Sequence, residues 1–343
     1  MGNSKRYDGI INSYLESRTG LELHQFISMV QLSNDESRMI ELVKDFCQQS
    51  HSNLDNRLAL EFFYLHGCHE ELTYFIHINK ESDNPLNRLY ANYYQHMSHA
   101  SLNRKIDEII EMTPSILTSD LGLQCLHYFL YAEIDITRKQ YDRLGYYLNK
   151  IQTLLQKIDN PLLATSFNIR THILLFMYYW KRNELILARK HAYRVLQHPD
   201  YSLQKAKLHI YLGLSYIYED FEAAIYHIDE ATLLAKRLEN KEIVSYIADF
   251  AKPFICAHFG QIEGIMTTNP IEQAHIEIAK GNQMKARNIL EQLSVETPFT
   301  QYYLGLATNN QKYFIHSFEG FMEQRGDHFF AKLPLHATEM VGL

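Results

Sequence analysis

Residues 209–231 read HIYLGLSYIYEDFEAAIYHIDEA, and this stretch decides the fold. A Leu-Gly pair at 212–213 is followed by Tyr216 and then by a short polar turn at 219–220. Small residues let two helices approach closely, while large residues fill the space between them. The stretch therefore predicts two antiparallel helices joined by a short turn and packed through Ala223, Ala224 and Ala231.

The same pattern recurs along the chain. A second copy begins at 172–175, turns at Asn183 and continues to Ala188 and Ala192; a third begins at 273–274 and turns at Gly281. The third copy continues to Ala286 and Leu290, and the Leu-Gly pair returns at 304–305. The equivalent alanines Ala188 and Ala224 are roughly one period of the ~34-residue tetratricopeptide repeat apart, and Ala224 and Ala286 are roughly two periods apart. Because one such unit cannot bury its apolar face alone, we expect an all-α, tetratricopeptide-like superhelical solenoid of antiparallel helix pairs.

Composition indicates a globular chain without a membrane span. Of the 343 residues, 46% are apolar and 21% charged, which is ordinary for such chains. The longest apolar run, 173–180, is far shorter than the ~20 residues that cross a bilayer, and no signal peptide precedes the first polar helix. We therefore expect a cytoplasmic protein without a membrane partner. Its widely spaced cysteines are expected to be buried thiols and not disulfides: Cys47, Cys68, Cys125 and Cys256.

Local patterns are helical too. Ser33 and Glu36 are expected to form a capping box at the start of a helix. The apolar face of that helix would consist of Met39, Leu42, Val43, Phe46 and Cys47. The prolines are expected to lie between helices, where a helix must start or stop: Pro85, Pro114, Pro161, Pro199, Pro253, Pro270, Pro298 and Pro334.

No catalytic or metal-binding constellation emerges. The run at 66–71, HGCHEE, with His96 and His99 nearby, has some of the residue types of a metal site. No second ligand pair has zinc-like spacing, so we favour a solvated turn between two helices. The adjacent carboxylates at 70–71 would point about 100° apart on a helix and would not share a substrate. The sequence predicts neither an enzyme nor a cofactor, and no metal.

Aromatic and basic residues mark a candidate binding surface. Four tyrosines lie on the first helices of their repeats, which usually face inward: Tyr178, Tyr211, Tyr302 and Tyr303. Near them are Arg170, Lys181, Lys205 and Lys207. A basic strip in an aromatic-lined groove suits a short peptide, whose terminal carboxylate or carbonyl groups meet the cations. Alternatively, the tyrosines pack between helices and the lysines keep an outer face of the protein soluble.

Nucleic-acid binding has weak support. The formal net charge is −7, and no basic stripe alternates with aromatics. The first twenty residues hold at most one helix, whereas a helix-turn-helix needs two packed helices and in practice a third. We expect the chain to give no sequence-specific gel shift with its upstream intergenic region.

Several stretches resemble the arbitrium receptors, the tetratricopeptide-type regulators by which certain Bacillus phages choose between lysis and lysogeny. The resemblance runs from about Tyr14 to Met340. Its motifs are ELVKDFCQQ at 41–49, IRTHILL at 169–175, YLGLSYIYEDFE at 211–222, EQAHIEIAKGNQMKARNILEQL at 272–293 and HFFAKLPL at 328–335. Their order and spacing carry the resemblance, since none is a catalytic signature.

The resemblance implies an intracellular receptor that binds a short signalling peptide in its concave groove and controls lysogeny transcription. In that family the peptide-free form binds DNA. Two departures make DNA binding doubtful here: the chain begins where the family's helix-turn-helix is ending, and it stops at 341–343, before the leucine-rich tail associated with dimerisation. We expect 1–32 to be N-terminal helices left from or linking to a DNA-binding region, and 33–343 to be the peptide-binding solenoid.

The resemblance also implies peptide-binding positions. Matching positions of the family are Met177, Lys181, Leu203, Tyr211, Leu214 and Gln273, with an apolar lining that favours a less polar peptide. Asp327 is expected to meet a cationic group of the peptide. Together with the groove residues, the predicted site is Arg170, Met177, Lys181, Leu203, Lys207, Tyr211, Leu214, Gln273, Tyr303 and Asp327.

Other functions stay open. A related repeat protein of the Rap type binds and inhibits a protein partner and is displaced by peptide. A plain repeat scaffold would need no peptide. A homodimer is a further possibility. A small secreted-precursor gene beside the chain's own gene would favour a peptide receptor.

Overall fold

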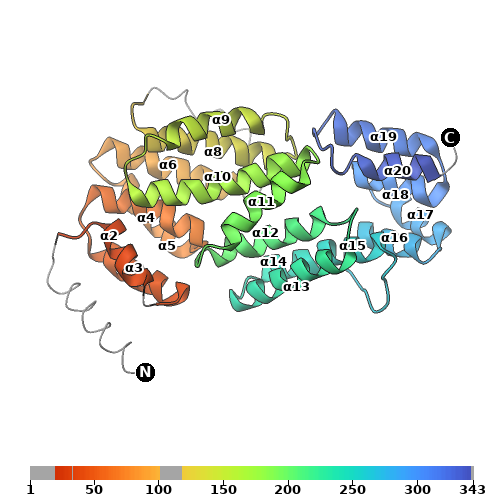
Figure 1. Ribbon diagram of the computed structural model, residues 1–343, viewed down its shortest axis with the longest axis horizontal. Helices are drawn as coiled ribbons and strands as arrows, with labels where there is room; N and C mark the ends of the chain where they lie inside the picture. The colour runs from red at the N-terminus through yellow and green to blue at the C-terminus, as the bar shows by residue number, and fades with distance from the viewer. Residues whose placement is uncertain (1–19, 33, 101–117, 341–343) are drawn as a thin grey trace. The chain divides into compact units, whose positions relative to one another are not determined.

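The computed structural model describes residues 20–32, 34–100 and 118–340. The regular secondary structure among these residues is helical, with no strand. The chain forms two compact units (Figure 1). Unit 1 comprises 1–137, 146–171 and 198–201, and unit 2 comprises 138–145, 172–197 and 202–343.

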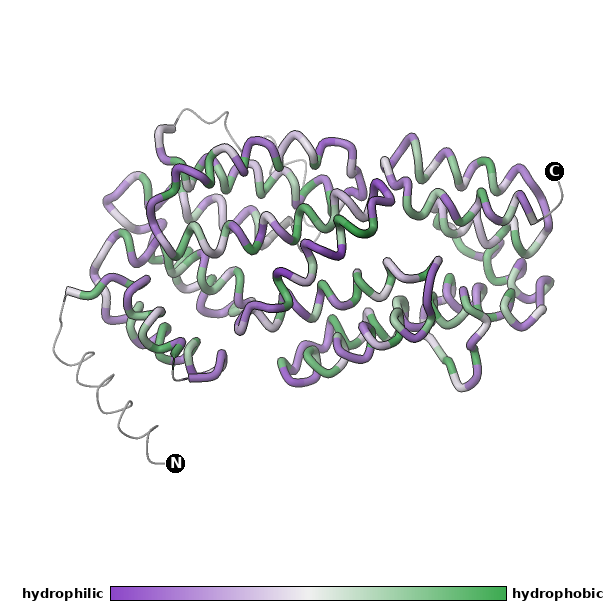
Figure 2. Tube along the Cα trace, in the orientation of Figure 1, coloured by the Kyte–Doolittle hydropathy of each residue, from purple (hydrophilic) through white to green (hydrophobic). Residues whose placement is uncertain are grey.

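Unit 1 is built from short helices that fold back on one another (Figure 1). They are α2 (Leu23–Gln31), α3 (Glu36–Gln49), α4 (Asn53–His66), α5 (His69–Lys80), α6 (Pro85–Ala100), α8 (Leu121–Thr137), most of α9 (Leu144–Leu155) and the first half of α10 (Pro161–Lys181). Apolar and polar residues alternate along these helices in Figure 2. This is the pattern expected where each helix buries one face.

Unit 2 continues the pairing of consecutive helices. It contains the second half of α10, α11 (Leu185–Leu196), α12 (Ser202–Ser215), α13 (Phe221–Arg237), α14 (Lys241–Tyr246), the π-helix η1 (Ile247–Ala251), α15 (Lys252–His258), α16 (Pro270–Ala279), α17 (Gln283–Glu291), α18 (Pro298–Thr308), α19 (Gln311–Met322) and α20 (Lys332–Met340). The pairs α12/α13, α16/α17 and α18/α19 pack closely. The predicted all-helical solenoid fold is confirmed.

The hairpin predicted at 209–231 is α12 and α13. Asp220 is the N-cap of α13, and its side chain accepts a hydrogen bond from the Glu222 N–H. Ala224 and Ala231 are fully buried. Gly213 faces α13 so closely that a Cβ there would lie 2.9 Å from the Ala224 carbonyl oxygen, which explains the Leu-Gly pair.

Two local predictions are wrong. Asp35, not Ser33, caps α3, because its side chain accepts the Arg38 N–H; Ser33 itself lies outside the described residues. Pro253 lies inside one continuous helical segment and not at its boundary, and Pro114 lies outside the described residues. The π-turn of η1 precedes Pro253, and such a turn accommodates a proline that cannot donate an i→i−4 hydrogen bond. Pro334 is in the first turn of α20, where the missing N–H has no intrahelical acceptor.

Gly305 permits a close approach between α18 and α19. A Cβ at this position would lie 2.5 Å from the ring of the buried Phe314. In Gly305→Ala we expect this clash, worth about 1–3 kcal/mol, to exceed the ~1 kcal/mol gain in helix propensity. Urea unfolding should show a net loss of stability. Gly20→Ala is the control, because nothing lies within 4 Å of its Cβ position, and equal stability of the two variants would contradict the prediction.

The hairpin also contains a buried histidine pair. Nδ1 of His209 lies 2.9 Å from Nδ1 of His227, and the two residues are 9% and 3% exposed. Burial lowers the pKa of His209 to about 4, with a contribution from His227. Burial, followed by the charge of Arg189, likewise lowers the pKa of His227 to about 4. Both imidazoles are therefore neutral near pH 7.

This pair predicts acid sensitivity. An unfolded histidine titrates near 6.5, so the unfolded chain takes up protons before the folded chain as the pH falls. The stabilisation of the fold by these neutral histidines is complete above about pH 6.5 and is lost towards pH 4, by on the order of 2–3 kcal/mol for each histidine. Urea unfolding at pH 7.5 and 5.0 measures this loss. The double variant His209→Gln/His227→Gln should show a smaller pH dependence, and an unchanged dependence would refute this origin.

Candidate functional site

Two of the predicted site residues form a buried ion pair in unit 2. Nζ of Lys181, the last residue of α10, lies 2.8 Å from Oδ2 of Asp327. The two side chains are only 4% and 3% exposed. They are 146 positions apart in the sequence, so the fold of unit 2 brings them together.

Aromatic rings surround the ammonium group of Lys181. Its Nζ lies 3.9 Å from the ring centroid of Trp180, 4.5 Å from that of Phe330 and 4.9 Å from that of Tyr141. Such cation–π contacts stabilise a cation that has lost its water. Trp180 also packs against Tyr211 on α12, with ring centroids 5.8 Å apart. The cation of the ion pair is therefore surrounded by aromatic rings.

Local backbone geometry holds both partners. Asn183 adopts a left-handed conformation with φ 62°, and such residues end helices, so α10 stops just after Lys181. Asp327 is held by hydrogen bonds in which it accepts the Phe330 N–H at Oδ1 and donates its own N–H to the Phe321 carbonyl. The preceding Gly326 has φ 62°, and a Cβ there would lie 2.1 Å from a carboxylate oxygen of Asp142. Glycine is therefore favoured beside Asp327.

The electrostatics of the pair reflect two opposing effects. Burial lowers the pKa of Lys181, because it penalises the charged amine, while the charge and hydrogen bond of Asp327 raise it. The net direction is downward. A buried lysine of this kind depends on a carboxylate partner to stay charged.

The other predicted residues of unit 2 differ in exposure. Met177, Leu203 and Leu214 are buried. Tyr303 is fully buried, and its hydroxyl lies 3.4 Å from Glu272. Lys207 and Gln273 are exposed, and the Gln273 amide donates to the Thr267 carbonyl. Their contacts with a peptide stay predictions.

Arg170, the remaining predicted residue, belongs to unit 1 and lies in a buried charge cluster. One terminal nitrogen donates to Glu61 Oε2 at 3.0 Å, and the other donates to Glu133 Oε1 at 3.0 Å. The hydroxyls of Tyr94 and Tyr64 donate to Glu61 and Glu133, respectively. Burial raises the pKa of Glu61 even though Arg170 lowers it. Both terminal nitrogens of Arg170 are engaged with carboxylates.

The aromatic enclosure of Lys181 was not predicted from the sequence. Trp180 and Tyr141 lie outside the motifs quoted above, and Phe330 and Tyr218 lie within two of them without being predicted to contact Lys181. The hydroxyl of Tyr218 donates a 3.0 Å hydrogen bond to the carbonyl of Phe329, next to Phe330. The available signals were the single tryptophan, adjacent to Lys181, and the Phe-Phe pair within HFFAKLPL. Neither the tryptophan nor the Phe-Phe pair indicates by itself which charged side chain its rings contact.

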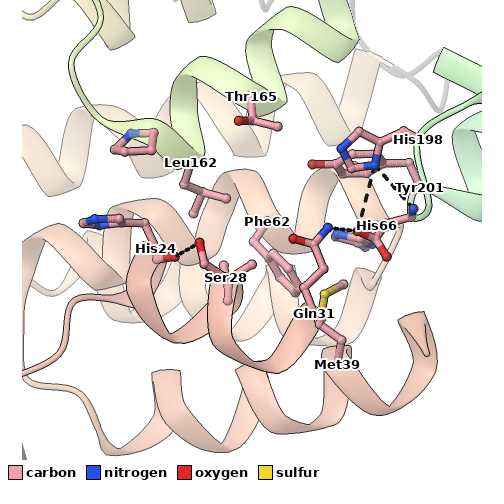
Figure 3. Close-up of a pocket in the computed structure, with 13 residues that line it drawn as sticks. His24, Ser28, Gln31, Met39, Phe62, His66, Leu162, Thr165, His198 and Tyr201 are labelled. Carbon is pink, nitrogen blue, oxygen red and sulfur yellow. Dashed lines mark hydrogen bonds and ion pairs between the residues drawn. The ribbon is translucent and has the colours of Figure 1, made fainter. Parts of the chain in front are cut away.

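Unit 1 contains a separate pocket of ≈ 110 Å³, drawn in Figure 3. In that view His198 and Tyr201 lie on the loop before α12, beside Gln31 of α2 and His66 of α4. Glu36 connects His66 and Tyr201. Its Oε1 lies 2.8 Å from Nδ1 of His66 and accepts a hydrogen bond from the Tyr201 N–H at 2.8 Å. Gln31 donates to the carboxylate of Asp200. The ten predicted peptide-binding residues are not among those lining this pocket.

The turn at 66–71 is structural. α4 ends at His66, Gly67 has φ 75°, and α5 begins at His69, so the turn lies between two helices as predicted. His66 itself, however, is buried and not solvated. In the parts of the chain that the structure describes, no group of three or more His, Cys, Asp or Glu side chains is placed to hold a metal ion. All four cysteines are free thiols; Cys47, Cys125 and Cys256 are buried, and Cys68 is half-buried. No helix within the described residues is both long enough and apolar enough to cross a membrane.

Comparison with known proteins identifies relatives. The model of the AimR transcriptional regulator-like family matches residues 39–339. An uncharacterized protein of Bacillus anthracis is 26% identical over 208 residues, which cover 57% of this chain and 76% of that protein.

Two solved structures share the fold. The structure of phAimR with a ligand has a TM-score of 0.72 at 18% identity, covering 90% of this chain and 98% of that chain. The structure of selenomethionine phAimR has a TM-score of 0.66 at 17% identity, covering 94% and 86% of the two chains. With the family match extending over most of its length, the chain belongs to the AimR transcriptional regulator-like family.

Proposed function

We propose that this protein is a cytoplasmic, non-enzymatic receptor for a short signalling peptide and that peptide binding regulates transcription in a bacterial host cell. Its family is one of transcriptional regulators, and the relative phAimR has been solved with a ligand. The observation that carries the proposal is the Lys181–Asp327 pair, a buried ion pair whose cation lies among aromatic rings.

A short peptide carries two charges that match this pair. Its terminal carboxylate can replace Asp327 as the partner of Lys181, and an amino group or cationic side chain can replace Lys181 as the partner of Asp327. Exchange of partners keeps both protein charges satisfied, whereas simple opening of the pair would leave them uncompensated at a cost of about 3–5 kcal/mol. The peptide therefore stabilises a conformation in which Lys181 and Asp327 are separated, whereas water does not compensate their charges there. Peptide binding shifts the population of states towards that conformation.

The apolar part of the proposed site selects the peptide side chains. Met177 on α10 and Leu203 and Leu214 on α12 are buried, and Tyr211 packs against Trp180. A polar side chain placed against such residues without a hydrogen-bond partner loses about 1–3 kcal/mol. The preferred peptide is therefore largely apolar between its charged ends. Lys207, Gln273 and Tyr303 complete the proposed site, whereas Arg170 is left outside it because carboxylates hold both its terminal nitrogens.

The direct test starts from the neighbouring reading frames: where one encodes a small secreted precursor, a synthetic hexapeptide is made from its carboxyl end. We expect binding in the micromolar range or tighter by calorimetry, together with a higher melting temperature, since a ligand that binds only the folded state stabilises it. A scrambled hexapeptide of the same composition is the control. Neither heat nor a thermal shift with the native sequence would refute the receptor function.

The two alternatives give different results, and peptide binding by itself excludes only the scaffold. A Rap-type regulator would bind the peptide but would also form a complex with a protein partner that the peptide dissociates. A scaffold would bind no peptide.

A further inference from the structure

Unit 2 repeats one side-chain arrangement in two consecutive helix pairs. In the first triad, Nδ1 of His172 on α10 lies 2.9 Å from Nδ1 of His191 on α11. Tyr179 stacks on His191 with ring centroids 5.7 Å apart and an interplanar angle of 5°. All three residues belong to unit 2, and both histidines are partly exposed.

The second triad has its histidines on α12 and α13 and its tyrosine, Tyr216, directly after α12. Nδ1 of His209 lies 2.9 Å from Nδ1 of His227, and Tyr216 stacks on His227 at 5.7 Å. The first histidine and the tyrosine have the same spacing in both copies of the repeat. The second triad is closed, however, because both histidines are buried and Nε2 of His227 is 3.2 Å from the hydroxyl of Tyr193.

We propose that His172 and His191 form a two-histidine site for a divalent transition-metal ion of the Ni²⁺ or Cu²⁺ class, with water completing the coordination. Imidazole nitrogen suits these ions. The partial exposure of the first triad leaves room for water ligands. The second triad has the same pair of nitrogens but is sealed, so it serves as an internal comparison.

The separation of the two nitrogens favours one coordination geometry. A metal at the usual distance of about 2.0–2.1 Å from each nitrogen would bind them at an angle of about 90° if they stayed 2.9 Å apart. That angle belongs to the square-planar or tetragonal sites of Cu²⁺ and Ni²⁺. A tetrahedral Zn²⁺ ion would require the nitrogens to move further apart. In each case the two rings must turn so that their lone pairs converge on the metal.

The protonation state is suitable at neutral pH. Burial lowers the pKa of His191 to about 4, followed by the effects of His172, Arg194 and Lys190; burial and Arg194 also lower the pKa of His172. Both imidazoles are therefore neutral, and the proton shared between the Nδ1 atoms passes to an Nε2 atom when the metal binds, without net proton release. The nearby Arg194 and Lys190 repel a metal ion, so we expect micromolar and not tighter affinity.

The test is calorimetric titration of the full chain, without a histidine tag, with NiCl₂ at pH 7.5. We expect one Ni²⁺ per chain, weaker binding of Zn²⁺, and a higher melting temperature with Ni²⁺. His191→Gln should weaken Ni²⁺ binding by roughly tenfold or more, since even outer-shell partners of a metal are worth ~10–100-fold. Circular dichroism of the metal-free variant checks that it is folded.

Two control variants make the result specific. His328→Asn removes an exposed histidine and should leave Ni²⁺ binding unchanged. His209→Gln alters the sealed second triad and should also leave it unchanged. Absence of Ni²⁺ binding to the wild-type chain, or full binding by a folded His191→Gln variant, would overturn the proposal.

Discussion

Lys181→Met is expected to destabilise unit 2 by about 3–5 kcal/mol, because it leaves the carboxylate of Asp327 buried without its cation. The methionine fills a similar volume among the aromatic rings, so the loss arises from charge and not from a cavity. Chemical unfolding followed by tryptophan fluorescence measures it, since the single tryptophan, Trp180, lies against Lys181.

A double variant separates the pair from general damage. Lys181→Met/Asp327→Leu removes both charges, and replacement of a buried ion pair by apolar residues is often neutral or stabilising. We expect it to recover most of the stability lost in Lys181→Met. Lys312→Met, at an exposed lysine, is the control and should change stability by less than about 0.5 kcal/mol. Equal stability of Lys181→Met and this control would contradict the buried-pair account.

Arg170→Met should destabilise unit 1 by a similar amount, about 3–5 kcal/mol near pH 7, because two carboxylates lose their shared cation. The deficit should shrink as the pH falls towards 5, since burial already raises the pKa of Glu61 and the loss of Arg170 would raise it further. A protonated Glu61 carries no unpaired buried charge. Urea unfolding at pH 7.5 and pH 5.0 gives both values.

The matched change is Arg182→Met. Arg182 pairs with Glu184 at the surface, where the side chains are 50% and 40% exposed, and such pairs contribute about 0–1 kcal/mol. Glu61→Gln/Arg170→Met should be more stable than Arg170→Met alone at pH 7. If Arg170→Met proved no more harmful than Arg182→Met, the buried cluster would not be the stabilising element that its geometry indicates.

The fold was predictable because its signal is local. The alanines at 224 and 231 and the glycine at 213 mark close helix contacts within one hairpin, and these residues are buried as expected. The location of Pro253 was not predictable, because its accommodation depends on a π-turn that no residue pattern announces.

The site was only half predictable because its contacts are distant in sequence. Lys181 and Asp327 were each identified as charged residues for a peptide, but their mutual pairing spans 146 positions and arises only from tertiary structure. The burial of Arg170 was missed for the same reason, because the carboxylate that it binds belongs to Glu61, 109 positions away in the sequence. A basic residue on the first helix of a repeat can therefore have either of two locations: it can be buried against a carboxylate, or it can face a groove. The sequence does not distinguish the two.

The most direct test of the peptide-receptor account is calorimetric titration with the native hexapeptide in two forms, one with a free terminal carboxylate and one with an amidated terminus. The account predicts that the free form binds in the micromolar range or tighter and that amidation weakens binding by about tenfold or more, since a charge-assisted hydrogen bond to Lys181 is lost. Equal affinities of the two forms would contradict the role of Lys181, and no binding of either form would contradict the receptor function itself.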